Sequence, residues 1–319
     1  MKLATTDDVC DYLGIAGLEL RPVLARLHDA AKALGESPHA DLLRMDACHR
    51  LRIGQDAAFA SREPFGAFVR IVEHAAAVLE ATRALPLATT TLDPGEVSVP
   101  PPDFDEATAE LRASFERNGF DLTHAASQRV LDAGCGDGRT SVALARLGFA
   151  EVVGFDFNPP ALAIVNVQFV HGDVLHLPFA DGEFDVVVSN GVLHHTYDAK
   201  RGLAEIRRVM KPGGAGWLEL YQRPGGLDRL AHYISRLLLR DANREVCRRY
   251  CYALGVPANR SSLLLELWLS PIAECYTPAE VDDMLRAAGF AAWRREPLSD
   301  EPHAAVKYGV GDNRYVIAG

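Results

Sequence analysis

The sequence predicts an α/β protein in two parts, a helical N-terminal region followed by a doubly wound, mainly parallel sheet. Two observations carry this prediction. Up to about residue 85, apolar residues recur every three or four positions, the spacing of amphipathic helices, and no strand pattern interrupts them. From Arg129 onward, short apolar runs alternate with helical patterns, which is typical of βαβ units.

A break in composition separates these two parts. Residues 86–105 are rich in proline and threonine, a composition typical of an extended linker, and a helical pattern at residues 106–118 follows. The chain therefore divides into a helical region at 1–95, a linker with its lead-in helix at 96–128, and an α/β domain at 129–319.

The α/β domain contains five short apolar runs that predict strands, at residues 130–131, 151–155, 167–170, 184–188 and 216–220. Helices are predicted near residues 140–147 and 200–210, and any helix between the second and third strands must be very short because Pro159 and Pro160 open that gap. Thr277, Pro278 and Glu280 predict a capping box and a late helix, which Gly289 ends. Residues 315–317 predict a final edge strand.

Composition and charge narrow the class of protein. Hydrophobic residues make up 48% of the 319 residues, and no run approaches the roughly 20 apolar residues of a membrane-spanning helix. The first residues lack the apolar core of a signal peptide, so we expect a cytoplasmic protein without a membrane partner. A net charge of −10 disfavours nucleic acid, because affinity for polyanions depends on lysine and arginine. The six cysteines have no zinc-type spacing, so no metal site is expected.

The motif with the most chemical content follows the first predicted strand. Asp132 precedes the loop Gly134-Cys135-Gly136-Asp137-Gly138, and a helical pattern comes next. Glycines are needed where the backbone turns tightly and a ligand approaches with no side chain in the way. The loop is one residue shorter than the GxGxxG of pyrophosphate-binding dinucleotide folds.

Polar residues at the ends of the next strands support a nucleoside site. Asp156 ends the second strand, where a carboxylate can accept hydrogen bonds from both hydroxyls of a ribose. Asp173 follows the third strand, where an acid can meet an adenine amino group, and Asn190 closes the fourth. Open α/β sheets bind ligands at the carboxyl ends of their strands, so these residues are expected to share one site.

This ordered set resembles the class I S-adenosylmethionine-dependent methyltransferases, most closely the small-molecule group that includes the menaquinone and ubiquinone biosynthesis methylases. The resemblance covers residues 130–220 well and 276–319 loosely. It implies a Rossmann-like sheet of seven strands whose last strand is antiparallel, with S-adenosylmethionine as cofactor. It also implies these contacts: Asp132, Gly134, Cys135, Gly136 and Gly138 around the methionine part, Asp156 at the ribose, Phe157 beside the adenine, Asp173 and Val174 at the adenine edge, and the Asn190 backbone near the ammonium group.

The implied activity is transfer of a methyl group to an oxygen, nitrogen or carbon of a small-molecule acceptor, with release of S-adenosylhomocysteine. His195 is the candidate catalytic base, because an imidazole titrates close to neutral pH and can take a proton from a hydroxyl or amine. In-line methyl transfer often needs only positioning, so a reaction without a base stays open.

Residues 223–275 form a predicted helical insertion that is rich in arginine, with eight arginines against three acidic residues between positions 221 and 260. These arginines form either a solvated basic face or the lining of an entrance for an anionic acceptor. The second interpretation is possible because guanidinium pairs bidentately with carboxylate and phosphate. In the second interpretation, the residues that contact the acceptor are His194, Tyr221, Arg244 and Arg248.

Other functions fit the sequence less well. A nicotinamide-dependent oxidoreductase is disfavoured by the loop spacing and by the lack of a Tyr-x-x-x-Lys set, and a catalytically silent cofactor-binding module by the intact glycine loop. A nucleic-acid methyltransferase is disfavoured by the acidic net charge. The N-terminal region carries no motif, but its apolar helix faces need a partner surface, which favours a homodimer or the support of a lid.

Overall fold

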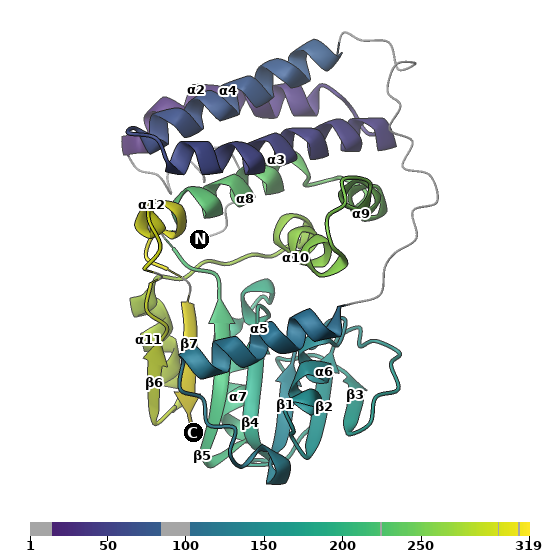
Figure 1. Ribbon diagram of the computed structural model, residues 1–319, viewed down its shortest axis with the longest axis vertical. Coiled ribbons are helices and arrows are strands. Elements are labelled where there is room, and N and C mark those ends of the chain that lie inside the picture. Colours follow the sequence, from purple (N-terminus) through teal and green to yellow (C-terminus); the bar gives the residue numbers. More distant parts are fainter. Residues whose placement is uncertain (1–14, 84–102, 224, 299, 312) are drawn as a thin grey trace. The chain divides into compact units, whose positions relative to one another are not determined.

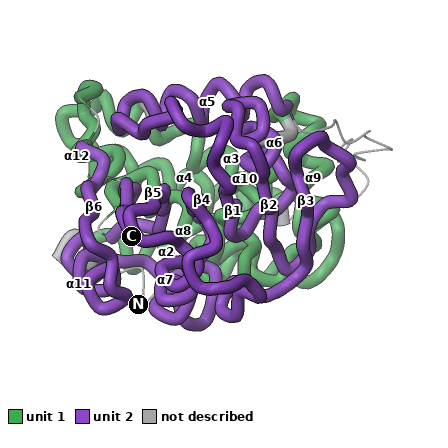
Figure 2. Tube along the Cα trace, turned by 90° about the horizontal axis from the view of Figure 1, so that it is seen from below, with its two compact units in different colours: residues 1–101, 224–273, 298–311 green, residues 102–223, 274–297, 312–319 purple. Residues whose placement is uncertain are grey.

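The computed structural model describes residues 15–83, 103–223, 225–298, 300–311 and 313–319. Contacts divide the chain into two units, one of residues 1–101, 224–273 and 298–311 and the other of residues 102–223, 274–297 and 312–319 (Figure 2). The expected insertion at 223–275 therefore shares a unit with the N-terminal helices. The predicted linker lies mostly in residues 84–102, outside the described residues.

A seven-stranded sheet forms the centre of the second unit, in the order β3-β2-β1-β4-β5-β7-β6. Neighbouring strands from β3 to β5 pair in parallel, whereas β7 is antiparallel to both β5 and β6. This arrangement confirms the predicted doubly wound sheet with an antiparallel last strand. The strands are β1 (Arg129–Ala133), β2 (Glu151–Asp156), β3 (Val167–His171), β4 (Phe184–Asn190), β5 (Met210–Leu220), β6 (Ala292–Arg295) and β7 (Asn313–Ala318).

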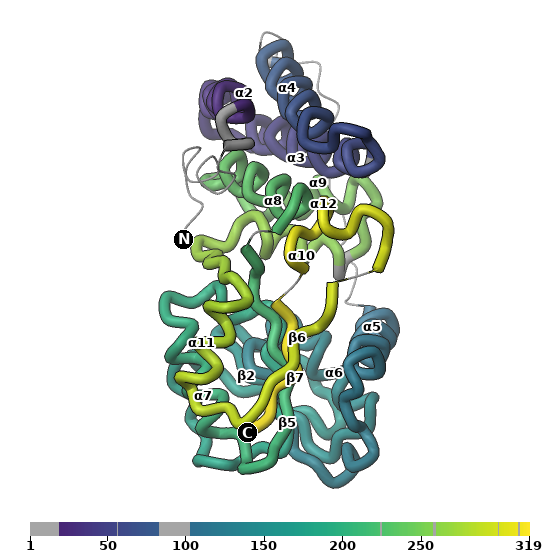
Figure 3. The backbone as a smooth tube through the Cα atoms, turned by 90° about the vertical axis from the view of Figure 1, so that its left-hand side faces the viewer, coloured from purple at the N-terminus to yellow at the C-terminus, as the bar shows by residue number. Residues whose placement is uncertain are grey.

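Helices cover both faces of this sheet, which Figure 3 shows edge-on. On one face, Val130 of β1 packs in a cluster with Phe115, and on the other face Leu131 packs in a cluster with Leu203. Successive side chains of a strand point to opposite faces, so the buried residues of β1 contribute alternately to the clusters on the two faces of the sheet. The covering helices are α5 (Phe104–Arg117) and α6 (Arg139–Arg146) on the first face, and α7 (Ala199–Val209) and α11 (Pro278–Ala288) on the second (Figure 1).

The last helix of this unit has the ends that the sequence predicts. The Thr277 side chain accepts a hydrogen bond from the Glu280 backbone N–H, and the Glu280 side chain accepts one from the Thr277 N–H, which completes the capping box. Gly289 ends α11 with a left-handed φ of 84°. Two residues at the start and one at the end therefore fix the bounds of α11.

The prediction of an edge strand at residues 315–317 was wrong in its position. These residues belong to β7, which lies between β5 and β6, so β6 forms the edge. Strand β6 was not predicted because its residues, Ala-Trp-Arg-Arg, have no apolar run. They alternate between exposed and half-buried, as an edge strand permits.

The expected short helix between β2 and β3 is absent, since residues 157–166 contain no helix. Pro159 and Pro160 lack backbone donors, and only ten residues join the two strands. The segment packs against the glycine loop instead. A Cβ atom added to Gly138 would lie 3.0 Å from Pro160 and 3.2 Å from Leu162.

The first unit is helical in its described residues, which confirms the helical patterns of the N-terminal region. Helix α3 contacts α4, α8 and α9, and α8 also contacts α10 and α12, so segments far apart in the sequence form one bundle (Figure 1). The helices are α2 (Ile15–Lys32), α3 (Pro38–Phe59), α4 (Pro64–Arg83), α8 (Gly226–Leu238), α9 (Arg244–Ala253), α10 (Ala258–Leu269) and α12 (Ala304–Tyr308).

The described residues lack two kinds of feature. Among them, no helix has both the length and the apolar character needed to cross a bilayer. The same residues hold no group of three or more His, Cys, Asp or Glu side chains suited to a metal ion. The described cysteines, Cys48, Cys135, Cys247, Cys251 and Cys275, are buried.

Candidate functional site

The glycine loop after β1 needs glycine for conformation and for space. Gly134, Gly136 and Gly138 have φ values of 95°, 52° and 84°, which are left-handed. A Cβ atom added to Gly134 would lie only 2.3 Å from the Val192 side chain, so the loop approaches the segment after β4 too closely for any other residue. The carboxyl ends of β1 and β4 therefore meet at Gly134.

Asp156 of β2 is fixed beside the middle of this loop. Its Oδ2 accepts a hydrogen bond of 2.9 Å from the Gly136 N–H, and its Oδ1 accepts one of 2.8 Å from the Asn158 N–H. A Cβ atom added to Gly136 would meet nothing within 4 Å, so the backbone there borders open space. A half-buried carboxylate beside an open glycine backbone is the arrangement expected for holding a polar ligand against the loop.

Asp132 supports the loop from behind. Its side chain is only 1% exposed, and its Oδ2 accepts a hydrogen bond of 2.6 Å from the Ser141 hydroxyl of α6. Burial, with smaller effects from Asp156 and Asp137, raises the pKa of Asp132 to about 7. Asp132 was predicted from the sequence, but Ser141 was not, because its place in the first turn of the helix after the loop is the only signal for it.

This buried carboxyl makes stability depend on pH. The pKa of Asp132 is about 7 in the folded protein against an ordinary value of 3.8, so between these two pH values the folded state holds a proton that the unfolded state has lost. The stabilising contribution is full below about pH 4 and is lost as the pH rises through 7. Asp132→Asn keeps an acceptor for Ser141 and has no proton to lose. We therefore expect the free energy of unfolding of the variant, relative to the parent, to rise between pH 5 and pH 8.

Urea unfolding at the two pH values measures this difference. The control is Asp121→Asn, because Asp121 is exposed and a hydrogen bond from Thr123 lowers its pKa, so it is ionised throughout this range. The difference in free energy of unfolding between Asp121→Asn and the parent should not change with pH. If the difference between Asp132→Asn and the parent were also independent of pH, the raised pKa of Asp132 would be contradicted.

The residues assigned to the adenine lie at the ends of β2 and β3. Phe157 is 76% exposed, and its ring centroid is 5.8 Å from that of His171. Asp173 is exposed, but one of its oxygens accepts a hydrogen bond of 2.9 Å from the Leu175 N–H. Val174 is buried, with 8% of its surface exposed. Phe157 and Asp173 are thus accessible to a ligand, while Val174 mainly contributes to the core.

Two further predicted contacts differ in exposure. Asn190 is exposed at the end of β4. Cys135 is 5% exposed, and burial, followed by the charges of Asp132 and Asp156, raises the pKa of its thiol above the usual range. The Cys135 side chain is therefore a neutral thiol and not a nucleophile.

Three aromatic rings form a cluster after β4 and β5. The His194 ring stacks on Tyr221 at 3.5 Å between centroids, and His195 lies edge-on to both rings. His194 is fully buried, and its Nδ1 accepts a hydrogen bond from the Tyr221 N–H at 3.2 Å. Tyr221 is 7% exposed, whereas His195 is half-buried. Of the two histidines, His195 is the accessible one.

Arg208 and Glu205 form an ion pair beside the turn before β4. The Arg208 guanidinium donates to the carbonyl oxygens of Leu177 and Phe179 and to the carboxylate of Glu205. Glu205 also accepts from the Leu177 N–H at 2.9 Å. Arg208 and Glu205 therefore stabilise the turn before β4 through its backbone groups. These bonds explain both residues without a role in ligand binding.

The predicted arginines of the insertion lie in the helical unit, on α9. Arg244 is exposed. Arg248 and Arg249 both pair with Glu245 on the same helix. The local positive charge is thus partly neutralised within α9.

Comparison with known proteins relates the middle of the sheet unit to one family. Residues 131–218 match the family described as methyltransferase domain. A demethylmenaquinone methyltransferase of Clavibacter sepedonicus is 40% identical over 97 residues, 28% of this chain and 39% of the relative. A demethylmenaquinone methyltransferase of Thermus thermophilus is 39% identical over 117 residues, 33% of this chain and 52% of the relative. The chain thus spans about half or less of these two relatives.

Among solved structures, a SAM-dependent methyltransferase from Archaeoglobus fulgidus aligns with 68% of this chain and 94% of its own, at 16% identity and a TM-score of 0.44. The segment matched by the family runs from β1 into β5 and contains the glycine loop, Asp156 and the two histidines. Residues 131–218 therefore form a methyltransferase domain.

Proposed function

We propose that this protein transfers a methyl group from S-adenosylmethionine to a small-molecule acceptor and releases S-adenosylhomocysteine. The observation that carries the proposal is the Asp156 carboxylate, held 2.9 Å from the Gly136 N–H where the loop borders open space. The family match of residues 131–218 and the two demethylmenaquinone methyltransferases support the same activity.

The residues at the carboxyl ends of β1 and β2 fit the cofactor. Gly134, Gly136 and Gly138 leave the backbone accessible to the methionine part, and Asp156 has the oxygens to accept the ribose hydroxyls. Phe157 offers an exposed aromatic face for the adenine, with Asp173 at its edge. When bound, the sulfonium of the cofactor supplies an electrophilic methyl group. The chain itself contributes orientation and the exclusion of water.

The acceptor side of the site is proposed to lie at the ring cluster. Val192 packs against Gly134, and the cluster begins two residues later, so the rings follow directly on the contact between the β1 and β4 loops. His194 is fixed by stacking and by its bond to the Tyr221 N–H, and Tyr221 is held beneath it. His195, the accessible ring, is the group we propose to meet the acceptor and take its proton.

Phe157→Ala tests the adenine side. Loss of an exposed stacking face is expected to weaken S-adenosylhomocysteine binding by about tenfold, since aromatic stacking contributes roughly 1–3 kcal/mol per base. Isothermal titration calorimetry measures the change. Val165→Ala is the matched control, because Val165 is 84% exposed on the same segment. Equal affinities for the Phe157 variant and the parent would place the adenine elsewhere.

The acceptor side is tested by kinetics on an acceptor found as described below. His195→Gln is expected to lower kcat by roughly 100-fold and to leave S-adenosylhomocysteine affinity unchanged, as loss of a general base does. Unchanged kcat in His195→Gln would show that positioning of the acceptor suffices for the reaction.

We also propose that Arg244 and Arg248 attract an anionic acceptor. Replacing both with Gln should then raise the KM for the acceptor and leave the other kinetic constants unchanged. An unchanged KM would show that the two arginines only form a solvated basic face.

The activity itself can be tested without knowing the acceptor. Methyl-labelled S-adenosylmethionine is incubated with the protein and either the low-molecular-mass filtrate of a cell extract or the retained proteins and nucleic acids. We expect enzyme-dependent label only in products of the filtrate. Label in the retained fraction would overturn the small-molecule class. Calorimetry with S-adenosylhomocysteine and NADH separates a methyltransferase from an oxidoreductase, and cofactor binding without any labelled product would indicate a silent module.

A further inference from the structure

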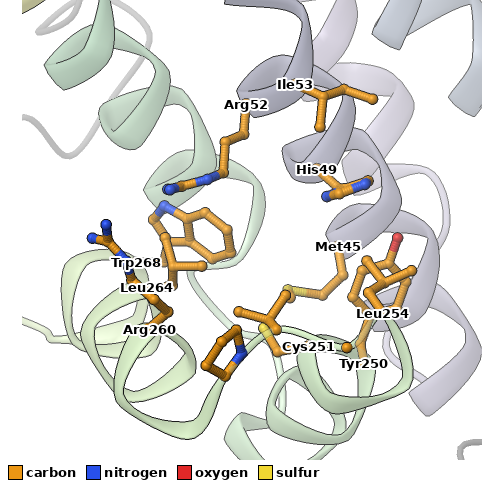
Figure 4. Close-up of a pocket in the computed structure, with 13 residues that line it drawn as sticks. Met45, His49, Arg52, Ile53, Tyr250, Cys251, Leu254, Arg260, Leu264 and Trp268 are labelled. Atoms are coloured by element: carbon orange, nitrogen blue, oxygen red, sulfur yellow. The ribbon is translucent and has the colours of Figure 1, made fainter. Parts of the chain in front are cut away.

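The helical unit contains a cavity that the methyl-transfer proposal does not use. Its volume is about 320 Å³, at the lower end of the roughly 300–1,000 Å³ of small-molecule pockets. Helices α3, α9 and α10 supply its walls, together with the turn between α9 and α10 (Figure 4). The cavity is therefore built from two distant parts of the sequence, 45–53 and 250–268.

Most of the wall is apolar. Met45, Leu254, Val256, Leu264 and Trp268 line the cavity, and the last two are 5% and 4% exposed. Cys251 adds a thiol whose pKa burial raises to about 11, so this side chain is neutral. A ligand here would meet hydrocarbon and aromatic surface over most of its body.

The two larger aromatic residues of the wall have their polar groups occupied outside the cavity. The Trp268 Nε1–H donates to His232 Nδ1 at 3.0 Å, and His232 Nε2 lies 3.4 Å from Asp228 Oδ2. The Tyr250 hydroxyl lies 3.3 Å from Asp46 Oδ1 and donates to it. Trp268 and Tyr250 therefore present ring surface to the cavity, and they are held in place by the buried His232 and the half-buried Asp46, respectively.

The buried His232 is neutral, which determines which nitrogen donates and which accepts in the hydrogen bonds between Trp268, His232 and Asp228. Burial lowers the pKa of His232, although the hydrogen bond to Asp228 opposes the effect. Because Nδ1 accepts from Trp268, the proton of the neutral ring sits on Nε2 and is donated to Asp228. The indole is thus oriented before any ligand arrives, which reduces the entropy lost on binding.

The charged side chains of the wall are arginines. Arg52, Arg260 and His49 line the cavity, and none of the described lining residues is acidic, in a protein of net charge −10. In the described part of the chain the Arg52 side chain makes no hydrogen bond or ion pair, although its charge acts on Asp228 and His232. In the view of Figure 4, Arg52 and Arg260 lie toward the Trp268 side, and Met45 and Leu254 toward the other.

We propose that this cavity binds a small organic anion, with an aromatic or alicyclic body against the Trp268, Leu264 and Met45 wall and an anionic group at Arg52. Guanidinium pairs bidentately with carboxylate and is more weakly hydrated than ammonium, so it suits an anion that enters an apolar space. This site lies within the helical unit and its test does not use methyl transfer, so the two proposals succeed or fail separately.

Calorimetry on the full chain with 2-naphthoate and 2-naphthamide tests the site, because the two probes share one ring system and differ in charge. We expect 2-naphthoate to bind at one site per chain and at least tenfold more tightly than the amide, which corresponds to about 1.4 kcal/mol. Arg52→Gln should remove this preference. Arg240→Gln is the matched control, since Arg240 is exposed in the same unit and does not line the cavity.

A second variant fills the space. Leu254 is 43% exposed at the cavity, so Leu254→Trp is expected to fold and to weaken both probes. Circular dichroism confirms folding of each variant. Equal affinities of the parent for the two probes, no saturable binding of 2-naphthoate, or a preference that survives Arg52→Gln would each overturn the proposal.

Discussion

Asp156→Ala is expected to weaken S-adenosylhomocysteine binding by about 100-fold from a parent affinity in the micromolar range, roughly −8 kcal/mol. Two effects add. The proposed ribose hydroxyls lose a charged acceptor, at about 1.5–3 kcal/mol per bond. The loop also loses the bond from the Gly136 N–H to Asp156 Oδ2, 2.9 Å long, which holds the open backbone in place. Calorimetry on the purified variant measures the loss.

Asp283→Asn is the control for this variant. It removes a carboxylate from the same unit, but Asp283 lies on α11, and its side chain is 77% exposed and pairs with Arg286. Its cofactor affinity should match that of the parent. If a folded Asp156→Ala protein also bound with parental affinity, the ribose assignment would be wrong, whichever reaction the protein catalyses.

The parts of the fold that the sequence predicted are those with local signals. The glycine loop was identified because a left-handed turn against Val192 admits only glycine at position 134. The start and end of α11 were predicted because Thr277, Glu280 and Gly289 each act within one helical turn. Asp156 was predicted because the end of a parallel strand fixes where a carboxylate lies relative to the loop.

The parts that escaped prediction depend on contacts distant in the sequence. Strand β6 carries two arginines and no apolar run, and only its pairing with β7 makes it a strand. The hydrogen bond from Ser141 to Asp132 joins a helix to a strand, and nothing in the sequence around either residue indicates that the two side chains meet. The cavity of the helical unit needs Arg52 of α3 and Trp268 of α10 together, and no periodicity in either segment reveals the other.

Gly136→Val is expected to abolish cofactor binding. Valine is strongly disfavoured at the φ of 52° found here, at a cost of about 1–3 kcal/mol. The loss of binding has a second cause, because a side chain at position 136 would extend into the space that borders the loop, where nothing now lies within 4 Å. That space is the proposed place of the methionine part. Calorimetry with S-adenosylhomocysteine and far-ultraviolet circular dichroism measure binding and helix content in parallel.

Gly148→Val separates obstruction from strain. Gly148 follows α6 in the same unit with a φ of 99°, and a Cβ atom added there would also meet nothing within 4 Å. This control therefore carries a comparable backbone penalty outside the loop. We expect both variants to lose several degrees in Tm and to keep their helix content, but only Gly136→Val to lose the cofactor. Equal loss of binding in both would show that strain alone disrupts the unit. Normal binding in Gly136→Val would mean that the cofactor does not lie against this loop.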